Sequence, residues 1–423
     1  MENFLTKIKI IFTDKSIRKR ILFVLLAFFI FRFLAVIPVP GVDQARLAQF
    51  LSSNQFFGVL NIFSGGGLSN LSIIMLGVGP YITASIIMQV LTLIIPKLKA
   101  LNQEEGDRGR IKFAQYARIL AIPLAVIQGF SLMYILQNSG ILGQLSAFEK
   151  ITNLSLIVGG SILLMWIGEL ISEFGIGNGV SMIIFAGIVS ALPGHISQLI
   201  FTFTTSQIPY YILFAVVGII VITAVVYVTE AERDIPITYA RQVRGGSTFG
   251  GGSTYLPLRL NQAGVIPIIF ALSILLFPQI FANMFKNSSH HILQVISTNL
   301  AQFTDSSWIY AVIYFLLVVA FTYFYTAVTF DPAKVSENLQ KSGAFIPGIR
   351  PGEHTAMYIS KVLTRITLFG AAFLGIVAVL PLIVKQVTGI TAVALGGTAL
   401  LIVVSVVIDL LKKVEAQISM REY

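Results

Sequence analysis

Residues 61–96 read NIFSGGGLSNLSIIMLGVGPYITASIIMQVLTLIIP. The second part of this stretch is apolar enough to cross a bilayer, yet a run of glycines stands before it, and Gly77, Gly79 and Pro80 interrupt its first half. Proline lacks a backbone N–H and glycine weakens a helix, so both residues favour a break. The stretch therefore predicts a membrane helix that is broken at its entry and preceded by a short segment of small residues.

The composition of the whole chain is that of a polytopic membrane protein. Of its 423 residues, 56% are hydrophobic and 11% are charged, whereas soluble domains carry about 25% charged residues. The chain has no cysteine, which excludes disulfides, a thiol nucleophile and cysteine metal sites. Its four histidines lack the HExxH spacing of a zinc site. We therefore expect neither a metal nor a cofactor.

Ten runs of sequence are long enough to span a membrane, which requires about 20 apolar residues per helix. The runs are continuously apolar rather than alternating, so they predict helices and not strands. We expect an all-α membrane protein with spans at residues 21–37, 71–95, 114–136, 151–171, 178–194, 209–229, 264–284, 308–328, 366–386 and 391–411.

The positions of Lys and Arg predict the orientation of these spans, because cytoplasmic loops carry an excess of both residues. With a cytoplasmic N-terminus, only five of the 29 basic residues fall outside the cell. Both termini are then cytoplasmic. The expected parts are an N-terminal arm (1–20), a first half (21–194), a second half (209–411), cytoplasmic loops within it (230–262 and 329–364) and a C-terminal tail (412–423).

Ten spans divide into two halves of five, and an odd-numbered half that is duplicated must insert upside down. Each half has a Gly/Pro-interrupted second span: GVGPYITASIIMQ at 77–89 and AGVIPIIFALSILLFP at 263–278. Paired interrupted helices indicate a central functional cavity. The pattern predicts two inverted five-helix halves around such a cavity.

The charged residues argue against most other functions. All 19 acidic residues lie in loops, tails or the ends of spans, whereas ion-coupled transporters usually keep ionisable groups inside the membrane. GIGNG (175–179) lacks the strand context of a dinucleotide fold, and RGGSTFGGGST (244–254) lacks the GK[ST] of a Walker loop. Since neither motif is complete, we do not expect this chain to be an enzyme. A sodium-coupled secondary transporter with a five-plus-five inverted repeat stays open as the alternative, as does a non-channel membrane insertase.

Branched apolar residues stand close to the interruptions in the spans. In a membrane helix such residues commonly pack against neighbouring helices or face lipid. If they instead converge, they form an apolar constriction that dewets and blocks ions. The candidates for this pore ring are Val78, Ile82, Val180, Ile184, Ile269 and Ile402.

The two long loops present arginines near turns. Arg241 and Arg244 lie in YARQVRGGS, and Arg350 lies in IPGIRPGEHT. Basic residues are needed there for topology alone, but the Pro-Gly frame around Arg350 predicts a shaped tip. Arginines on such a tip can pair with RNA phosphates or with carboxylates of a partner. We interpret the loops as a docking surface.

Five stretches, in this order along the chain, resemble the bacterial SecY family, the channel subunits of the general protein translocase. They are NIFSGGGLSNLSIIMLGVGPYITASIIMQVL (61–91), GIGNGVSMIIFAGIVSALP (175–193), LPLRLNQAGVIPIIFALSILLFP (256–278), IPGIRPGEHTAMYISKVLTRIT (346–367) and GGTALLIVVSVVIDL (396–410).

The resemblance implies ten helices in two halves around an hourglass pore, hinged between spans 5 and 6. It implies that the segment before span 2 is a plug, a short helix that seats in the closed channel and is only weakly held because of its glycines. It also identifies the six candidates above as the pore ring. The plug residues are Phe63, Ser64, Gly65, Gly66, Gly67, Leu68, Ser69 and Asn70.

The resemblance further implies a lateral gate between spans 2, 3, 7 and 8, with Ser85, Gln128 and Ser273 as its polar residues. The function it implies is a protein-conducting channel that translocates unfolded secretory polypeptides across the bacterial plasma membrane and releases transmembrane segments into lipid. The implied partners are SecE-like and SecG-like small subunits, the motor ATPase SecA, the ribosome through its rRNA, nascent secretory and membrane-protein chains, and the phospholipid bilayer. SecA and the ribosome would dock through Arg241, Arg244 and Arg350, although the glycine-rich loop between spans 6 and 7 is less basic than in many relatives.

Glu169 and Glu173 lie next to the loop between spans 4 and 5, which is expected to be cytoplasmic. Their negative charge runs against the excess of basic residues in such loops, and the sequence offers no reason for them.

Overall fold

The computed structural model describes most of the chain. The described residues are 14–40, 47, 61, 64–103, 106–143, 145–201, 208–239, 242–244, 247–249, 252–285, 291–305, 307–388 and 391–419.

One helix falls on each of the ten predicted spans. Among the described residues, four helices are individually long and apolar enough to cross a membrane, and a fifth span arises if the bent pair α5 and α6 is counted as one. The ten helices are α2 (Lys15–Leu34), α5 (Gly79–Ile94), α7 (Gly106–Asn138), α8 (Ala147–Phe174), α9 (Gly179–Phe201), α10 (Ile208–Glu230), α11 (Ile266–Phe285), α13 (Ser307–Thr329), α15 (Glu353–Thr388) and α16 (Thr391–Ser419).

Span 2 is broken at its entry, which confirms the prediction from its glycines and proline. Residues 71–78 form turns apart from Ser72, which forms a β-bridge with Pro38, and α5 begins only at Gly79, with Pro80 in its first turn. Gly77 has φ +59, a left-handed conformation that a side chain disfavours. At its other end α5 stops before Pro96 and bends by 116° into α6 (Pro96–Gln103).

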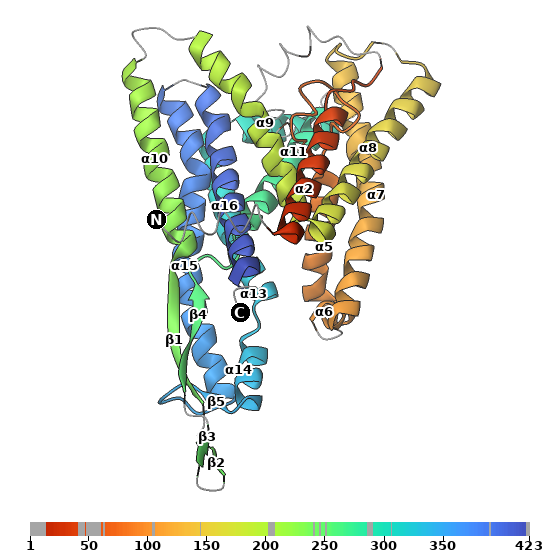
Figure 1. Ribbon diagram of the computed structural model, residues 1–423. Helices are drawn as coiled ribbons and strands as arrows, with labels where there is room; N and C mark the ends of the chain where they lie inside the picture. Colours follow the sequence, from red (N-terminus) through yellow and green to blue (C-terminus); the bar gives the residue numbers. More distant parts are fainter. Residues whose placement is uncertain are drawn as a thin grey trace.

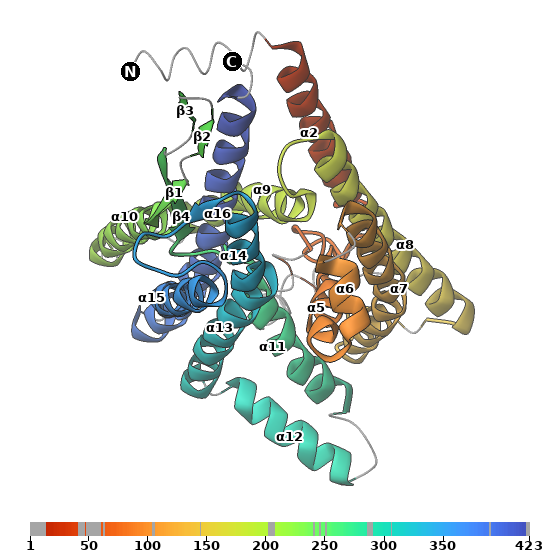
Figure 2. The ribbon, with the colours of Figure 1, turned by 90° about the horizontal axis from the view of Figure 1, so that it is seen from below.

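The helices form two groups (Figures 1 and 2). In the first half, α5 packs on α7, α7 on α8, and both α2 and α9 on α8; in the second, α10 packs on α16, α16 on α15, α15 on α13 and α13 on α11. The halves meet along two seams. On one seam α9 contacts α16, and on the other α11 contacts α5 and α7. The fold is therefore the expected all-α membrane architecture of two five-helix halves.

The two long loops of the second half fold together at one end of the bundle (Figure 1). Strand β1 (Glu232–Tyr239) pairs antiparallel with β4 (Ser253–Arg259) and with β5 (Ala344–Phe345), in the order β4-β1-β5. The short strands β2 (Gln242–Arg244) and β3 (Ser247–Phe249) form the tip of the hairpin. We call β1, β4, β5 and helix α14 (Pro332–Lys341) the sheet unit.

A small apolar core holds the sheet unit to the membrane helices. Ile235 and Leu258 of the hairpin pack with Ile346 and with Ile359 of α15. The sequence did not predict these strands, because hydropathy identifies long apolar spans and not short strands within polar loops. One more unpredicted helix, α12 (His291–Asp305), lies between α11 and α13.

A candidate pore between the two halves

The six candidate ring residues come from four helices that line the seams. Val78 and Ile82 stand at the start of α5, Val180 and Ile184 in the first two turns of α9, Ile269 in α11 and Ile402 in α16.

The structure brings all six into one apolar cluster. Val180 is half-buried and packs against this cluster, while the other five are at most 6% exposed. That burial excludes the alternative that these five face lipid. The shared seam is consistent with an apolar constriction, but the cluster is the main core of the protein and packing alone would also bury them.

The plug segment adopts turns in its described residues, 64–70, and the expected short helix is wrong there. Phe63 lies outside the described residues. The physical reason is backbone geometry, since Gly65 and Gly66 have φ of +64 and +83, which interrupts a right-handed helix. Side chains then satisfy the backbone: Ser64 Oγ accepts from Leu68 N at 3.0 Å, and Asn61 Oδ1 accepts from Ser69 N at 2.9 Å.

Close backbone contacts seat this segment between the first and fifth spans. Gly65 lies on the ring of Phe31 in α2 and against Gly187 in α9, and neither glycine has room for a Cβ atom. Gly66 lies beside the guanidinium of Arg32, whose Nη1 donates to Ser190 Oγ of α9 at 3.2 Å. The glycines therefore allow both the turn and the close approach.

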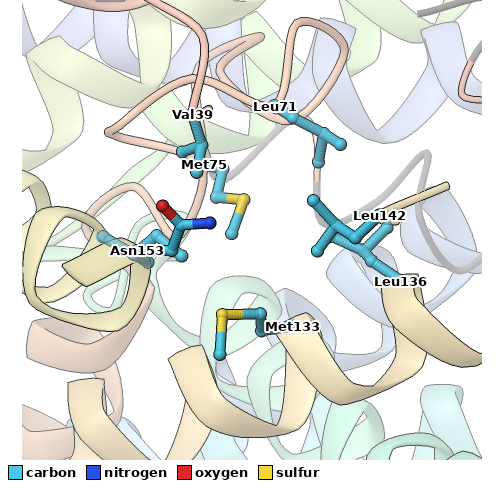
Figure 3. A pocket seen from close by; sticks show the side chains of 8 residues that line it. Val39, Leu71, Met75, Met133, Leu136, Leu142 and Asn153 are labelled. Carbon is cyan, nitrogen blue, oxygen red and sulfur yellow. The ribbon is translucent and has the colours of Figure 1, made fainter. Parts of the chain in front are cut away.

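An apolar cluster of the first half holds the other end of the plug segment. Leu68 and Leu71 are buried among residues of α7 and α8. A small pocket lies next to them, where Met75 and Met133 point into a shared space and Asn153 Nδ2 donates to Pro40 O at 3.3 Å (Figure 3). The residues that line it are Val39, Leu71, Met75, Met133, Leu136, Leu142, Asn153 and Ile157.

Helix α8 supports the irregular stretch before α5, a role that the sequence reading missed. Ser161 Oγ donates to Gly77 O at 2.9 Å. One residue earlier, Gly160 lies so close to the backbone of Ile73 that a Cβ atom would clash with its carbonyl. The available signal was the GGS motif at 159–161, small residues in the middle of span 4.

The predicted gate residues lie on helices that meet at the second seam, but the structure does not join them to one another. Ser273 Oγ donates to Ile269 O within α11 at 2.8 Å, and Ser85 Oγ accepts from Gln89 Nε2 within α5 at 3.4 Å. Gln128 of α7 does reach across, with Nε2 donating to Thr83 Oγ1 of α5 at 3.5 Å.

An ion pair between α7 and α8 explains the presence of Glu169, for which the sequence offered no reason. Arg118 Nε donates to Glu169 Oε1, and both side chains are partly buried. A carboxylate in the last two turns of a span is thus neutralised by the neighbouring helix. Glu173, one turn later, is exposed.

Arg350 lies on an exposed turn between β5 and α15, and the predicted shaped tip is confirmed. Its carbonyl accepts from Thr355 Oγ1 at 2.9 Å, and Ser336 Oγ of α14 donates to Gly352 O at 2.6 Å. Arg244 ends β2, and Arg241 lies outside the described residues. Within the described ranges, His, Asp and Glu form no group of three that could hold a metal ion.

A ten-helix membrane fold, with an apolar seam between its halves and a glycine-rich segment seated beside that seam, is the architecture of a membrane channel. The family model described as SecY matches residues 72–411, and the chain belongs to the SecY family.

Its relatives match it over nearly their whole length. It is 43% identical to protein translocase subunit SecY of Thermus thermophilus, over 96% of this chain and 94% of the relative, and 39% identical to SecY of Mycobacterium tuberculosis, over 96% of each. Among solved structures it resembles a protein-conducting channel (TM-score 0.66, 19% identity, 96% and 93% of the chains). It also resembles Sec61 in a canine ribosome–channel complex (TM-score 0.63, 19% identity, 96% and 93%).

Proposed function

We propose that this chain forms the channel through which unfolded secretory polypeptides cross the bacterial plasma membrane. The observation that carries the proposal is the meeting of the six ring candidates in one apolar cluster along the seams, beside a plug segment closely packed on α2 and α9. An apolar constriction excludes water and ions and still deforms around a passing chain. The sodium-coupled alternative gains no support from the relatives, which are translocase subunits.

The seam where α11 meets α5 and α7 is the proposed lateral exit. Hydrophobic segments of a passing chain would partition there into lipid, while polar segments would continue through the ring. In this proposal Ser85, Gln128 and Ser273 line the exit, and the parts of the chain are the arm, two halves and tail expected from the sequence.

The driving force is proposed to come from partners, because the chain carries no nucleotide-binding motif. SecA or a translating ribosome would dock on the sheet unit through Arg350, with Arg241 and Arg244 on the hairpin tip. Small subunits resembling SecE and SecG would hold the halves together. Both termini and the sheet unit would face the cytoplasm, in agreement with the distribution of Lys and Arg.

Photocrosslinking tests the proposal. A photoreactive residue at Ile82 or at Ile269 should crosslink to a secretory chain that is stalled during SecA-driven transport in membranes. Ile94 is the matched control, since it lies on the same helix as Ile82 but at the helix end, where its side chain is exposed outside the apolar cluster. Crosslinks at both ring positions and none at Ile94 support the channel. No crosslink at either ring position, together with saturable uptake of a small solute, would favour the carrier.

A further inference from the structure

Helix α12 lies across the ends of two membrane helices. It is seen lengthwise in Figure 2, next to α11 and α13, in the view along the bundle. Ser297 is buried in the middle of α12, and its Oγ donates to Ala282 O of α11 at 2.6 Å. Its C-terminal end is separated from the start of α13 by one residue. These connections fix α12 at the level where α11 and α13 leave the membrane.

The surface of α12 is divided into three sectors, because successive residues of a helix are rotated by about 100°. Ser297 marks the sector that packs on the protein. Gln294 and Thr298 are exposed in a polar sector. Ile292, Val295 and Ile296 form an apolar sector, in which Ile292 is 73% and Ile296 is 50% exposed.

The adjacent span, α13, also carries exposed apolar side chains at its start. Trp308, Ile309 and Val312 are exposed at the start of α13, immediately after α12. Tryptophan is enriched at membrane–water interfaces, where its ring is partly apolar and partly polar. The exposed Trp308 therefore indicates that the start of α13, next to the end of α12, lies near a membrane surface.

We infer that α12 is an interfacial helix whose apolar sector inserts into the lipid at the end of the bundle opposite the sheet unit. Ile292 and Ile296 would be the deepest side chains, and the exposed Asn299 in the same sector keeps the insertion shallow. Helices of this kind bury their apolar face about 5–10 Å into the boundary between headgroups and acyl chains.

The charge of α12 specifies the kind of lipid surface. Its exposed polar residues are neutral, and its charged or titratable residues are His291 and Asp305 at its two ends. Binding therefore rests on apolar burial and not on attraction to anionic headgroups. We expect the same insertion in neutral and in anionic bilayers.

One consequence rests on the proposed function, whereas the insertion itself does not. Helix α11 is one side of the proposed lateral exit, and α12 is joined to it through Ser297. If that exit opens by moving α11 away from α5 and α7, α12 must move within the membrane surface. The lipid would then hold one side of the exit.

The native chain has no cysteine, so single fluorescent labels can be placed without other changes. The probes are Ile296→Cys in the apolar sector and Thr298→Cys as the matched control in the polar sector. The full-length chain, purified with its associated subunits, is placed in bilayers with bromine atoms at a known acyl-chain depth. Quenching should be several times stronger at position 296 than at 298, and equal in neutral and anionic lipid.

Each other outcome overturns the inference. Equal, weak quenching at both positions would leave α12 in water. A label at 296 that is shielded from aqueous quenchers but not reached by brominated lipid would show a protein partner on this face. Quenching that requires anionic lipid would show attraction through charge. Protein-transport activity of the labelled variants is recorded separately, so failure of insertion is distinguishable from failure of the channel function.

Discussion

Gly65 of the plug segment lies directly against Gly187 of α9, and a Cβ atom on Gly187 would overlap the backbone of Gly65. The contact joins a segment that precedes span 2 to the fifth span of the same half. Both partners are backbone, so neither can move aside by changing a rotamer. The plug segment can therefore occupy this position only while residue 187 has no side chain.

Replacing Gly187 with Ala should displace the plug segment and open the channel to ions. Overpacking of this kind costs about 1–3 kcal/mol, and each 1.4 kcal/mol changes a population about tenfold. The state in which the plug segment packs on α9 should become correspondingly less populated. Ion conductance of the purified channel in planar bilayers should rise in the absence of a translocating chain.

Gly194→Ala is the control for this prediction. Gly194 lies on the same helix, and a Cβ atom there meets nothing within 4 Å. Alanine also favours a helix over glycine by about 1 kcal/mol, so helix propensity cannot explain a leak. Unchanged conductance in the Gly187→Ala channel would contradict the seating of the plug on α9.

Replacing Leu68 with Ala should loosen the other end of the plug segment. Leu68 is fully buried in the cluster of α7 and α8, and removal of a buried leucine side chain costs about 2–5 kcal/mol. Amide hydrogen exchange of residues 64–71 should become faster, since local opening becomes easier. Leu93→Ala, at an exposed position of α5, should leave this exchange unchanged. Equal exchange rates in the Leu68→Ala and native chains would show that this cluster does not hold the plug.

The membrane helices could be predicted from the sequence because hydropathy depends on local composition. The break before α5 was also predictable, since Gly77, Gly79 and Pro80 act on the backbone where they stand. The burial of Val78 and Ile184 in one cluster followed from a family resemblance and could not follow from either helix alone.

The features that the sequence did not reveal depend on contacts between distant residues. The sheet unit pairs β1 with β5, and four helices, α11 to α14, lie between these two strands in the sequence. The turn conformation of the plug needs Asn61 and Phe31 as partners. The pair of Arg118 and Glu169 joins two spans that no local pattern connects.

The ion pair of Arg118 and Glu169 should stabilise the first half. Breaking a buried pair leaves one charge without a partner, and here the cost of Glu169→Gln should be on the order of 1–3 kcal/mol because both side chains are partly exposed. The double variant Arg118→Gln with Glu169→Gln should lose less stability than the sum of the losses in the two single variants. Thermal unfolding in detergent measures all three variants.

Glu173→Gln is the control for this ion pair, since it removes an exposed carboxylate one turn away on α8. It should change stability by less than about 0.5 kcal/mol. Additive losses in the double variant would show that Arg118 and Glu169 do not stabilise each other.

Reversal of charge at Arg350 should strongly reduce export driven by SecA, the partner proposed to dock at this turn, while leaving the fold intact. Arg350 lies on an exposed turn whose backbone is fixed by Thr355 and Ser336, so its side chain can change without loss of the turn. In Arg350→Glu a carboxylate replaces the five N–H donors that pair with an acidic or phosphate partner. Lys361→Glu is the matched control, because it makes the same change of charge at another exposed position nearby on α15. If transport into membrane vesicles falls for Arg350→Glu alone, the position and geometry of Arg350 are important for docking. An equal fall in transport for both variants would contradict this and show that only the total charge at this end of the protein is important.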